Sequence, residues 1–158
     1  MPKKLPIIYH PDEKLSTESE NFDVSEILQK DQQAFFKDML YTMKKHKGVG
    51  IAAPQVGVLK RFCYVSNNGR KPQLLINPVI TKRSSSKEWA EEGCLSIPNV
   101  YGQVERNMSV TVEYVDTAAE KQELSAEGFL ARVIQHEIDH LDGVLFIDKA
   151  KDIYESGI

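Results

Sequence analysis

The chain has 158 residues, 41% of them hydrophobic, which is about the length of one domain and enough for a folded core. Its 23 acidic and 20 basic residues give a formal net charge of −3, which argues against direct nucleic-acid recognition, because such modules usually carry a basic surplus. Two cysteines cannot form a disulfide framework, no secretory signal is visible and no apolar run could span a bilayer, so we expect one domain, residues 1–158, in a reducing cytoplasm without a membrane partner.

In chain order, an irregular segment at residues 6–21 is followed by a predicted amphipathic helix at residues 25–47. Phenylalanine and methionine recur there at helical spacing, and a basic run before Gly48 is typical of a helix end. Val, Ile, Thr and Tyr then predict strands at residues 61–66, 73–81, 109–115 and 120–124. An exposed polar turn or sheet edge is expected at residues 82–88, and a second helix at residues 125–141. Short strands between two helices indicate an α+β domain.

The second predicted helix carries the motif HEIDH at residues 136–140. Its two histidines are one turn apart and differ by about 40° around the helix axis, so their imidazoles can reach one metal ion. Glu137 lies about 60° from His140, where it can act on a metal-bound water without binding the ion itself. The alternative is a pair of buried histidines that are satisfied by hydrogen bonds. We favour the metal site.

A catalytic metal site needs a third protein ligand. Asp139 is a poor candidate, because it points away from the direction that the two histidines share. Cys94, in the segment EEGCLSIP at residues 91–98, can supply a thiolate, whereas Cys63 lies within an ordinary strand pattern. The sequence therefore favours Cys94, although a lone cysteine is more often a small buried residue.

The segment GVGIAAPQVG at residues 48–57 is rich in small residues. Its glycines would allow the backbone to approach an extended ligand closely, and Gln55 adds one neutral side-chain donor. A stretch of this kind is usually a loop, and it lacks the lysine of a phosphate-binding loop.

The segments GVGIAAPQ, EGCLS and QHEIDH, in this order and spacing, resemble the three signature motifs of the peptide deformylase family. INP at residues 76–78 and HLDGVLFID at residues 140–148 are also similar, and the likeness covers roughly residues 8–148. The resemblance implies mostly antiparallel sheets packed around a central buried helix that carries HExxH, with a second amphipathic helix near the N-terminus. It implies a hydrolase that removes the N-formyl group from the formyl-methionine of nascent proteins and releases formate.

The resemblance also assigns roles to single residues. One divalent metal ion, Fe(II) with Zn(II), Ni(II) or Co(II) as alternatives, would be held with a water by Cys94, His136 and His140. Glu137 would take a proton from the water and give it to the leaving amine. The Gln55 amide and the backbone N–H of Leu95 would stabilise the tetrahedral oxyanion.

For the substrate, the resemblance implies an extended peptide beside the backbone of Val49, Gly50 and Gly93. The methionine side chain would enter a pocket lined by Val49, Tyr101, Phe129, Val133 and the ring of His136. Tyr101 stands where some members have arginine, and Asn99 stands where glycine is frequent, although asparagine also tolerates left-handed backbone.

The expected partners are N-formyl-methionyl nascent peptides. We expect the protein to be a monomer in the cytoplasm of a bacterium or of a phage host. Many bacterial members dock on the ribosome through a basic C-terminal helix. The residues after Ala150, KDIYESGI, carry no basic surplus, so we expect at most transient ribosome association.

Two other functions fit part of the pattern. An ordinary HExxH metallopeptidase would cut internal peptide bonds, but it would normally take a further His or Glu downstream, and no histidine follows His140. A non-catalytic metal-binding homologue would need neither Glu137 nor Gln55, and both are present.

Overall fold

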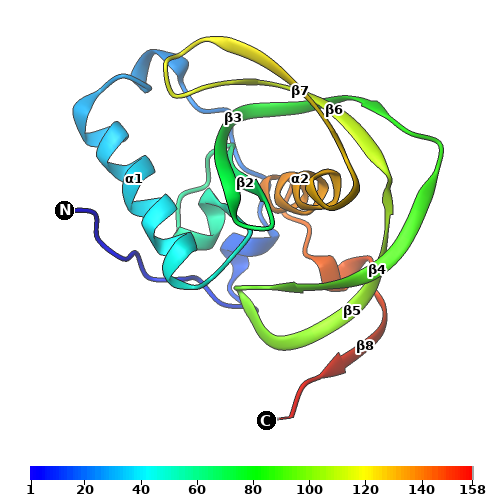
Figure 1. The fold of residues 1–158 in the computed structure, drawn as a ribbon. Coiled ribbons are helices and arrows are strands. Elements are labelled where there is room, and N and C mark those ends of the chain that lie inside the picture. Colours follow the sequence, from blue (N-terminus) through cyan, green and yellow to red (C-terminus); the bar gives the residue numbers. More distant parts are fainter. Residues whose placement is uncertain (158) are drawn as a thin grey trace.

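The computed structural model describes residues 1–157, which contain two α-helices and eight β-strands (Figure 1). The helices are α1 (Lys30–Lys45) and α2 (Gly128–Leu141). The strands are β1 (Gly50–Ala52), β2 (Phe62–Asn67), β3 (Arg70–Arg83), β4 (Lys87–Cys94), β5 (Ile97–Asn107), β6 (Ser109–Val115), β7 (Lys121–Glu127) and β8 (Lys151–Glu155). No helix in this range is both long and apolar enough to cross a membrane.

The strands form two sheets. One has the order β1-β2-β3-β6-β7, and the other has the order β4-β5-β8. Every pair of neighbouring strands described is antiparallel. Helix α2 is seen nearly end-on in the middle of the molecule, with strands of both sheets around it (Figure 1). The predicted α+β fold, with antiparallel sheets around a central helix, is confirmed.

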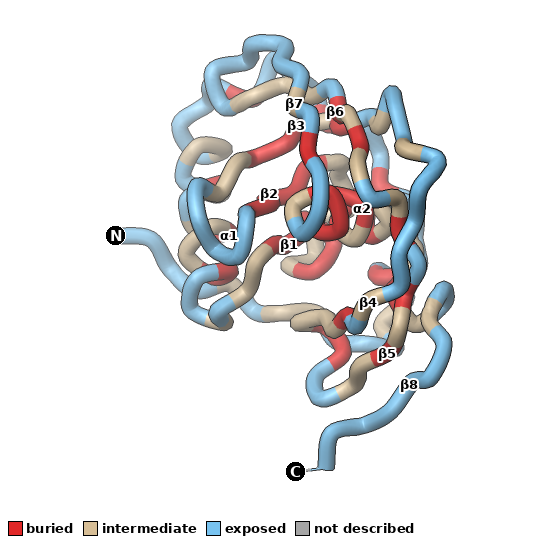
Figure 2. Tube along the Cα trace, turned by 45° about the vertical axis from the view of Figure 1, so that its right-hand side comes forward, coloured by how far each residue is buried: buried red, intermediate tan, exposed pale blue. Residues whose placement is uncertain are grey.

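Burial explains why α2 is central. Its apolar side chains pack into one cluster with residues of β2 and β6, and the chain is most deeply buried around α2 and β2 (Figure 2). This cluster includes Cys63, Val65, Val112, Ile134 and Leu141. Burying aliphatic side chains of this size stabilises a fold by about 1.5–3 kcal/mol each, so α2 is held from several sides.

Two further apolar clusters hold the periphery. Phenylalanines and methionines of α1 pack against Phe62 of β2, which confirms the amphipathic first helix. A smaller cluster lies under β5 and joins Leu15, Ile97, Val104 and Phe146. The small sheet is therefore fixed on the side where Cys94 ends β4.

Several predicted boundaries were wrong. Helix α1 begins at Lys30 rather than near residue 25, because the Asp23 side chain accepts a hydrogen bond from the Ser25 amide and caps a separate short turn. Residues 125–127 are strand rather than helix, since they pair with β6 as far as Glu127. The expected loop at residues 48–57 contains β1 and a 3-10 turn. Of the exposed turn or edge expected at residues 82–88, Lys87 and Glu88 begin β4, which is an edge strand of the small sheet.

Candidate active site

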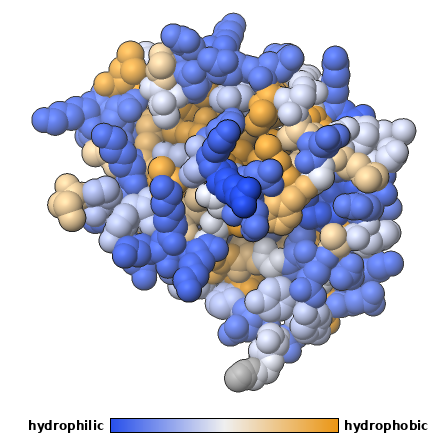
Figure 3. Space-filling model, in the orientation of Figure 1, coloured by the Kyte–Doolittle hydropathy of each residue, from blue (hydrophilic) through white to orange (hydrophobic). Residues whose placement is uncertain are grey.

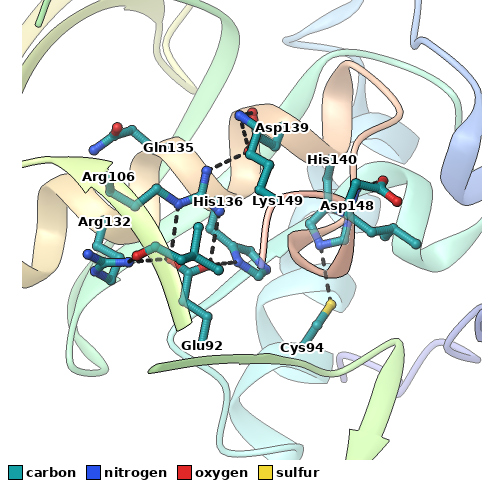
Figure 4. Close-up of polar contacts among 12 residues, drawn as sticks. Glu92, Cys94, Arg106, Arg132, Gln135, His136, Asp139, His140, Asp148 and Lys149 are labelled. Atoms are coloured by element: carbon teal, nitrogen blue, oxygen red, sulfur yellow. Dashed lines mark hydrogen bonds and ion pairs between the residues drawn. The ribbon is translucent and has the colours of Figure 1, made fainter. Parts of the chain in front are cut away.

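Three side chains that could hold a metal ion meet between the small sheet and α2. Cys94 ends β4, and His136 and His140 lie one turn apart on α2. One ligand atom from each lies within 4.8 Å of the other two. The Cys94 sulfur is 3.3 Å from Nε2 of His140 (Figure 4). A thiolate and two imidazoles are a donor set that suits a divalent transition metal, so the residues fit the expected ion.

The two histidines have different surroundings. Nδ1 of His136 lies 2.9 Å from Oε1 of Glu92, which leaves Nε2 as the ring nitrogen that could bind a metal ion. Nδ1 of His140 is buried, and no residue from 1 to 157 forms a hydrogen bond with it. A carboxylate behind a metal-binding histidine fixes the ring and its tautomer, so Glu92 orients His136.

The protonation of the histidines also fits a cation at this place. Burial lowers the pKa of His140 well below its usual value and keeps its ring neutral. Burial also opposes a charge on His136, but hydrogen bonds with Cys94 and Glu92 raise its pKa well above the usual value. His140 therefore offers a neutral nitrogen, and a metal ion would displace the proton from His136.

Glu92 is the centre of a buried ionic network (Figure 4). Arg106 of β5 donates two hydrogen bonds of 2.9 Å to its carboxylate, and Arg132 of α2 donates a third of 2.7 Å. Arg106 also contacts Asp139, which pairs with Lys149. Burial alone would raise the pKa of Glu92, but the bonds with His136 and Arg106 hold it well below its usual range. Glu92 is therefore ionised and rigidly held.

Glu137 is buried beside the three donors without being one of them. It is 4% exposed, and within the described chain its Oε1 has no hydrogen-bond partner. A Cβ atom on Gly50 would lie 2.6 Å from Oε2 of Glu137, so only glycine leaves room for this carboxylate. Burial raises the pKa of Glu137 to about 7. A carboxyl group with such a pKa can both accept and donate a proton near neutrality.

The Gln55 side chain is held so that its amide nitrogen faces the Cys94 sulfur. Its Oε1 accepts a hydrogen bond of 2.9 Å from the Ala52 amide, and its Nε2 donates to the Ser96 hydroxyl at 3.1 Å. The same Nε2 lies 3.5 Å from the Cys94 sulfur. Leu95 follows Cys94 in the turn between β4 and β5. Gln55 and Leu95 both line the cavity of this site.

A cavity of about 330 Å³ opens at this site. In the space-filling view, hydrophobic side chains lie around a strongly hydrophilic group in the middle of the face on which α2 is seen end-on, and hydrophilic side chains form the rim (Figure 3). The predicted site residues that line the cavity are Val49, Gly50, Gln55, Gly93, Cys94, Leu95, Tyr101, Phe129, Val133, His136 and Glu137. His140 lies behind this wall, in contact with Cys94.

Four charged residues that were not predicted as site residues also line the cavity: Lys47, Glu91, Glu92 and Arg132. Two of them carried a usable signal. Glu92 is two residues before Cys94, so in a strand both side chains point to the same face. Arg132 is four residues before His136 and therefore shares its face of the helix. Asn99 does adopt the left-handed conformation, with φ of 64°.

Comparison with known proteins identifies the family. Residues 4–156 match the family model described as polypeptide deformylase. A relative from Xanthomonas axonopodis pv. citri, peptide deformylase 2, is 42% identical over 146 residues, which cover 91% of this chain and 85% of that protein.

Solved structures agree. A peptide deformylase from Synechococcus elongatus in complex with actinonin has a TM-score of 0.87 and 41% identity, over 94% of this chain and 79% of that one. A Met-Ala-Ser-bound class I type b peptide deformylase from Acinetobacter baumannii has a TM-score of 0.90 and 35% identity, over 94% and 99% of the two chains. The chain therefore belongs to the peptide deformylase family.

Proposed function

We propose that this protein removes the N-formyl group from formyl-methionine at the start of nascent proteins, and that the cavity is its active site. Different residues of the cavity would hold the metal, carry the proton and stabilise the oxyanion. The observation that carries the proposal is that the Cys94, His136 and His140 donors meet beside the buried Glu137 carboxylate at one cavity, and that Oε1 of Glu137 has no hydrogen-bond partner among residues 1–157. Hydrolysis of an amide needs an activated water, a proton carrier and stabilisation of an oxyanion.

The three donors would hold one divalent ion, which we propose to be Fe(II), with Zn(II), Ni(II) or Co(II) as substitutes. When bound, such an ion supplies a Lewis acid that lowers the pKa of a water and polarises a carbonyl oxygen. Glu92 keeps His136 in the orientation that the site needs.

Glu137 would take the proton of the attacking water and pass it to the amine that leaves. Its pKa of about 7, raised by burial, suits both steps at neutral pH. Its unpartnered oxygen leaves the carboxylate free to accept that proton, and Gly50 leaves space for it to lie against β1.

Gln55 and the backbone N–H of Leu95 would donate to the oxygen that becomes negative in the tetrahedral intermediate. The fixed hydrogen bonds of Gln55 with Ala52 and Ser96 support this role, because a donor that needs no reorganisation stabilises a transition state most effectively.

The peptide would run between Val49 and Gly50 on one side and Gly93 on the other. Phe129, Val133 and the His136 ring would surround the methionine side chain, with Tyr101 at the rim. Their shared place on the cavity wall supports this arrangement.

We further propose one catalytic domain over residues 1–158, acting as a monomer in the cytoplasm of a bacterium or of a phage host. Two free cysteines and the bacterial relatives support a reducing compartment. Transient association with the ribosome stays a prediction.

Formate release tests the function. The anaerobically prepared protein should release formate from formyl-Met-Ala-Ser and should not cut an unblocked peptide of the same length. Cleavage of internal peptide bonds would instead favour an HExxH metallopeptidase. Metal binding without either reaction would indicate a non-catalytic homologue.

A further inference from the structure

The irregular segment near the start of the chain contacts the elements that carry the site, although none of its residues lines the cavity. We call residues 8–19 the N-terminal belt. In Figure 1 this segment is drawn in blue and passes below α2. The Leu15 side chain of the belt is fully buried in the apolar cluster under β5, so the belt is packed against the small sheet.

Two backbone amides of the belt donate hydrogen bonds to the segments that carry the proposed oxyanion donors. The Ile8 amide donates to the carbonyl of Gln55 at 2.8 Å. The His10 amide donates to the carbonyl of Ser96 at 2.9 Å, and Ser96 directly follows Leu95. Because the two amides are two residues apart, the chain between them spans at most about 7 Å. The belt therefore limits how far apart the Gln55 and Leu95 segments can lie.

The far end of the belt is fixed to the end of α2. The Ser19 amide donates to the carbonyl of Leu141 at 2.8 Å. A Cβ atom on Gly143, which has φ of 74°, would lie 2.8 Å from the backbone carbonyl carbon of Ser16, so only glycine leaves room for the belt there. The belt is thus anchored on the helix that carries the two proposed histidine ligands.

The bonds of the belt explain why its sequence carries no motif. Its amides bind carbonyl oxygens, and every residue type except proline can supply an amide. Gln55 is nevertheless held from two directions, because Ala52 and Ser96 fix its side chain and Ile8 fixes its backbone. The position of the Gln55 amide nitrogen therefore depends on the belt as well as on the turn that contains this residue.

We propose that Ile8 and His10 are positioning residues whose backbone amides set the spacing of Gln55 and Leu95. This proposal rests on the proposed function, in which Gln55 and Leu95 donate to the oxyanion. Such donors must lie about 2.7–3.1 Å from the oxyanion, so a shift of about 1 Å in either segment removes much of their effect. The metal ligands are held by β4 and α2, so the belt acts on kcat rather than on KM or metal binding.

Ile8→Pro tests the first of the two amides, because proline has no N–H to donate to Gln55. With the metal-loaded protein and formyl-Met-Ala-Ser, we expect kcat to fall about 10- to 100-fold, somewhat less than the loss of a whole oxyanion donor. KM and the number of metal ions per chain should stay at the wild-type values. Ile8→Ala shortens the side chain but keeps the amide, so its kcat should fall less than that of Ile8→Pro.

A double-mutant cycle shows whether Ile8 acts through Gln55. Gln55→Ala removes the side-chain donor but keeps the carbonyl that accepts from Ile8. Adding Ile8→Pro to Gln55→Ala should lower kcat by less than about twofold further, because the group that Ile8 positions is already absent. Effects of the two changes that multiply would show a general change of structure and would overturn the proposal.

A glycine inserted between Tyr9 and His10 lengthens the belt without removing a hydrogen-bond donor. We expect kcat to fall about tenfold or more in a protein that remains folded by thermal unfolding. The same glycine inserted between Pro2 and Lys3 is the matched control. It lies before the Lys3 amide, which donates to Oδ1 of Asp38 at 2.9 Å, and therefore outside the belt, so it should change nothing.

A wild-type kcat in Ile8→Pro and in the insertion after Tyr9 would overturn the proposal. So would a loss of bound metal or a rise in KM as large as the fall in kcat, since either would show a general structural role. If Ile8→Pro does not fold, the insertion decides. If the wild type released no formate from formyl-Met-Ala-Ser, the proposed function itself would fail, which is a different result from an unchanged kcat in the belt variants.

Discussion

The inner and outer ends of the cavity are built in opposite ways. At the inner end, Glu92 binds two arginines and a histidine away from solvent, and both arginines form further hydrogen bonds. At the outer end, Glu91 has one hydrogen bond from the half-exposed Tyr154. Charges are coupled strongly where water is excluded and weakly where it is present. A single change should therefore disable the inner end, but only shift affinity at the outer end.

The largest effect should come from Glu137→Gln at the inner end. Without a proton acceptor, kcat for formyl-Met-Ala-Ser should fall about 10²- to 10⁴-fold, while the metal content stays near that of the wild type. Formate release and elemental analysis of the same sample measure both quantities. Turnover at the wild-type rate would show that Glu137 is not the base.

Gly50→Ala should come next. The added methyl group would lie 2.6 Å from Oε2 of Glu137, so the carboxylate must move. A displacement of about 1 Å at a reacting group can cost about 10²-fold in rate, and we expect a fall in kcat of this order with little change in bound metal. Gly69→Ala is the control for a glycine change, because a Cβ atom there meets nothing within 4 Å, although φ is 85° and some loss of stability follows. An unchanged kcat in Gly50→Ala would contradict the placement of Glu137.

Glu92→Gln tests the network behind His136. Metal affinity should fall about 10- to 100-fold, as is usual when a residue that orients a ligand is lost. The free energy of unfolding should drop by about 3–5 kcal/mol, because the buried Arg132 loses its counter-charge and Arg106 keeps only that of Asp139. Chelator competition and denaturant unfolding measure the two effects. Glu91→Gln, the exposed neighbour, should leave both quantities unchanged, and equal losses in the two variants would remove the contrast between the two ends.

Deletion of residues 151–158 should have the smallest effect on the chemistry. Strand β8 is exposed and lies outside the cavity wall, so kcat for formyl-Met-Ala should stay within about twofold of the wild type. A collapse of kcat in a folded variant would show that β8 serves the inner end as well.

Elements with a regular apolar pattern could be predicted from the sequence, and elements without one could not. Helix α2 was predictable because its apolar face and the HEIDH spacing both follow the helical period, and the three donors could be named from spacing and chemistry. The hairpin of β4 and β5 was not predicted, because KEWAEEGC does not alternate between apolar and polar residues. Strand β8 is short and exposed, so it carries no burial pattern.

Contacts between side chains of different strands could not be predicted from the sequence either. Arg106 reaches Glu92 across the β4–β5 hairpin, and Tyr154 reaches Glu91 across β5. Neither partner is close to its acid in sequence, so only the strand pairing brings them together. The pocket residues were placed through the family resemblance, and the cavity brings them together.

The most direct test of the metal centre is an anaerobic titration of metal-free protein with Fe(II), with formate release from formyl-Met-Ala-Ser as the readout. We predict that activity rises linearly and stops at one ion per chain. Loss of an orienting residue weakens metal binding by about 10- to 100-fold, and Cys94→Ser, which removes a proposed ligand, should weaken it further. The activity of this variant should not saturate at one ion per chain. Full activity without metal, or an unchanged titration in Cys94→Ser, would contradict the assignment of Cys94, His136 and His140 as the ligands.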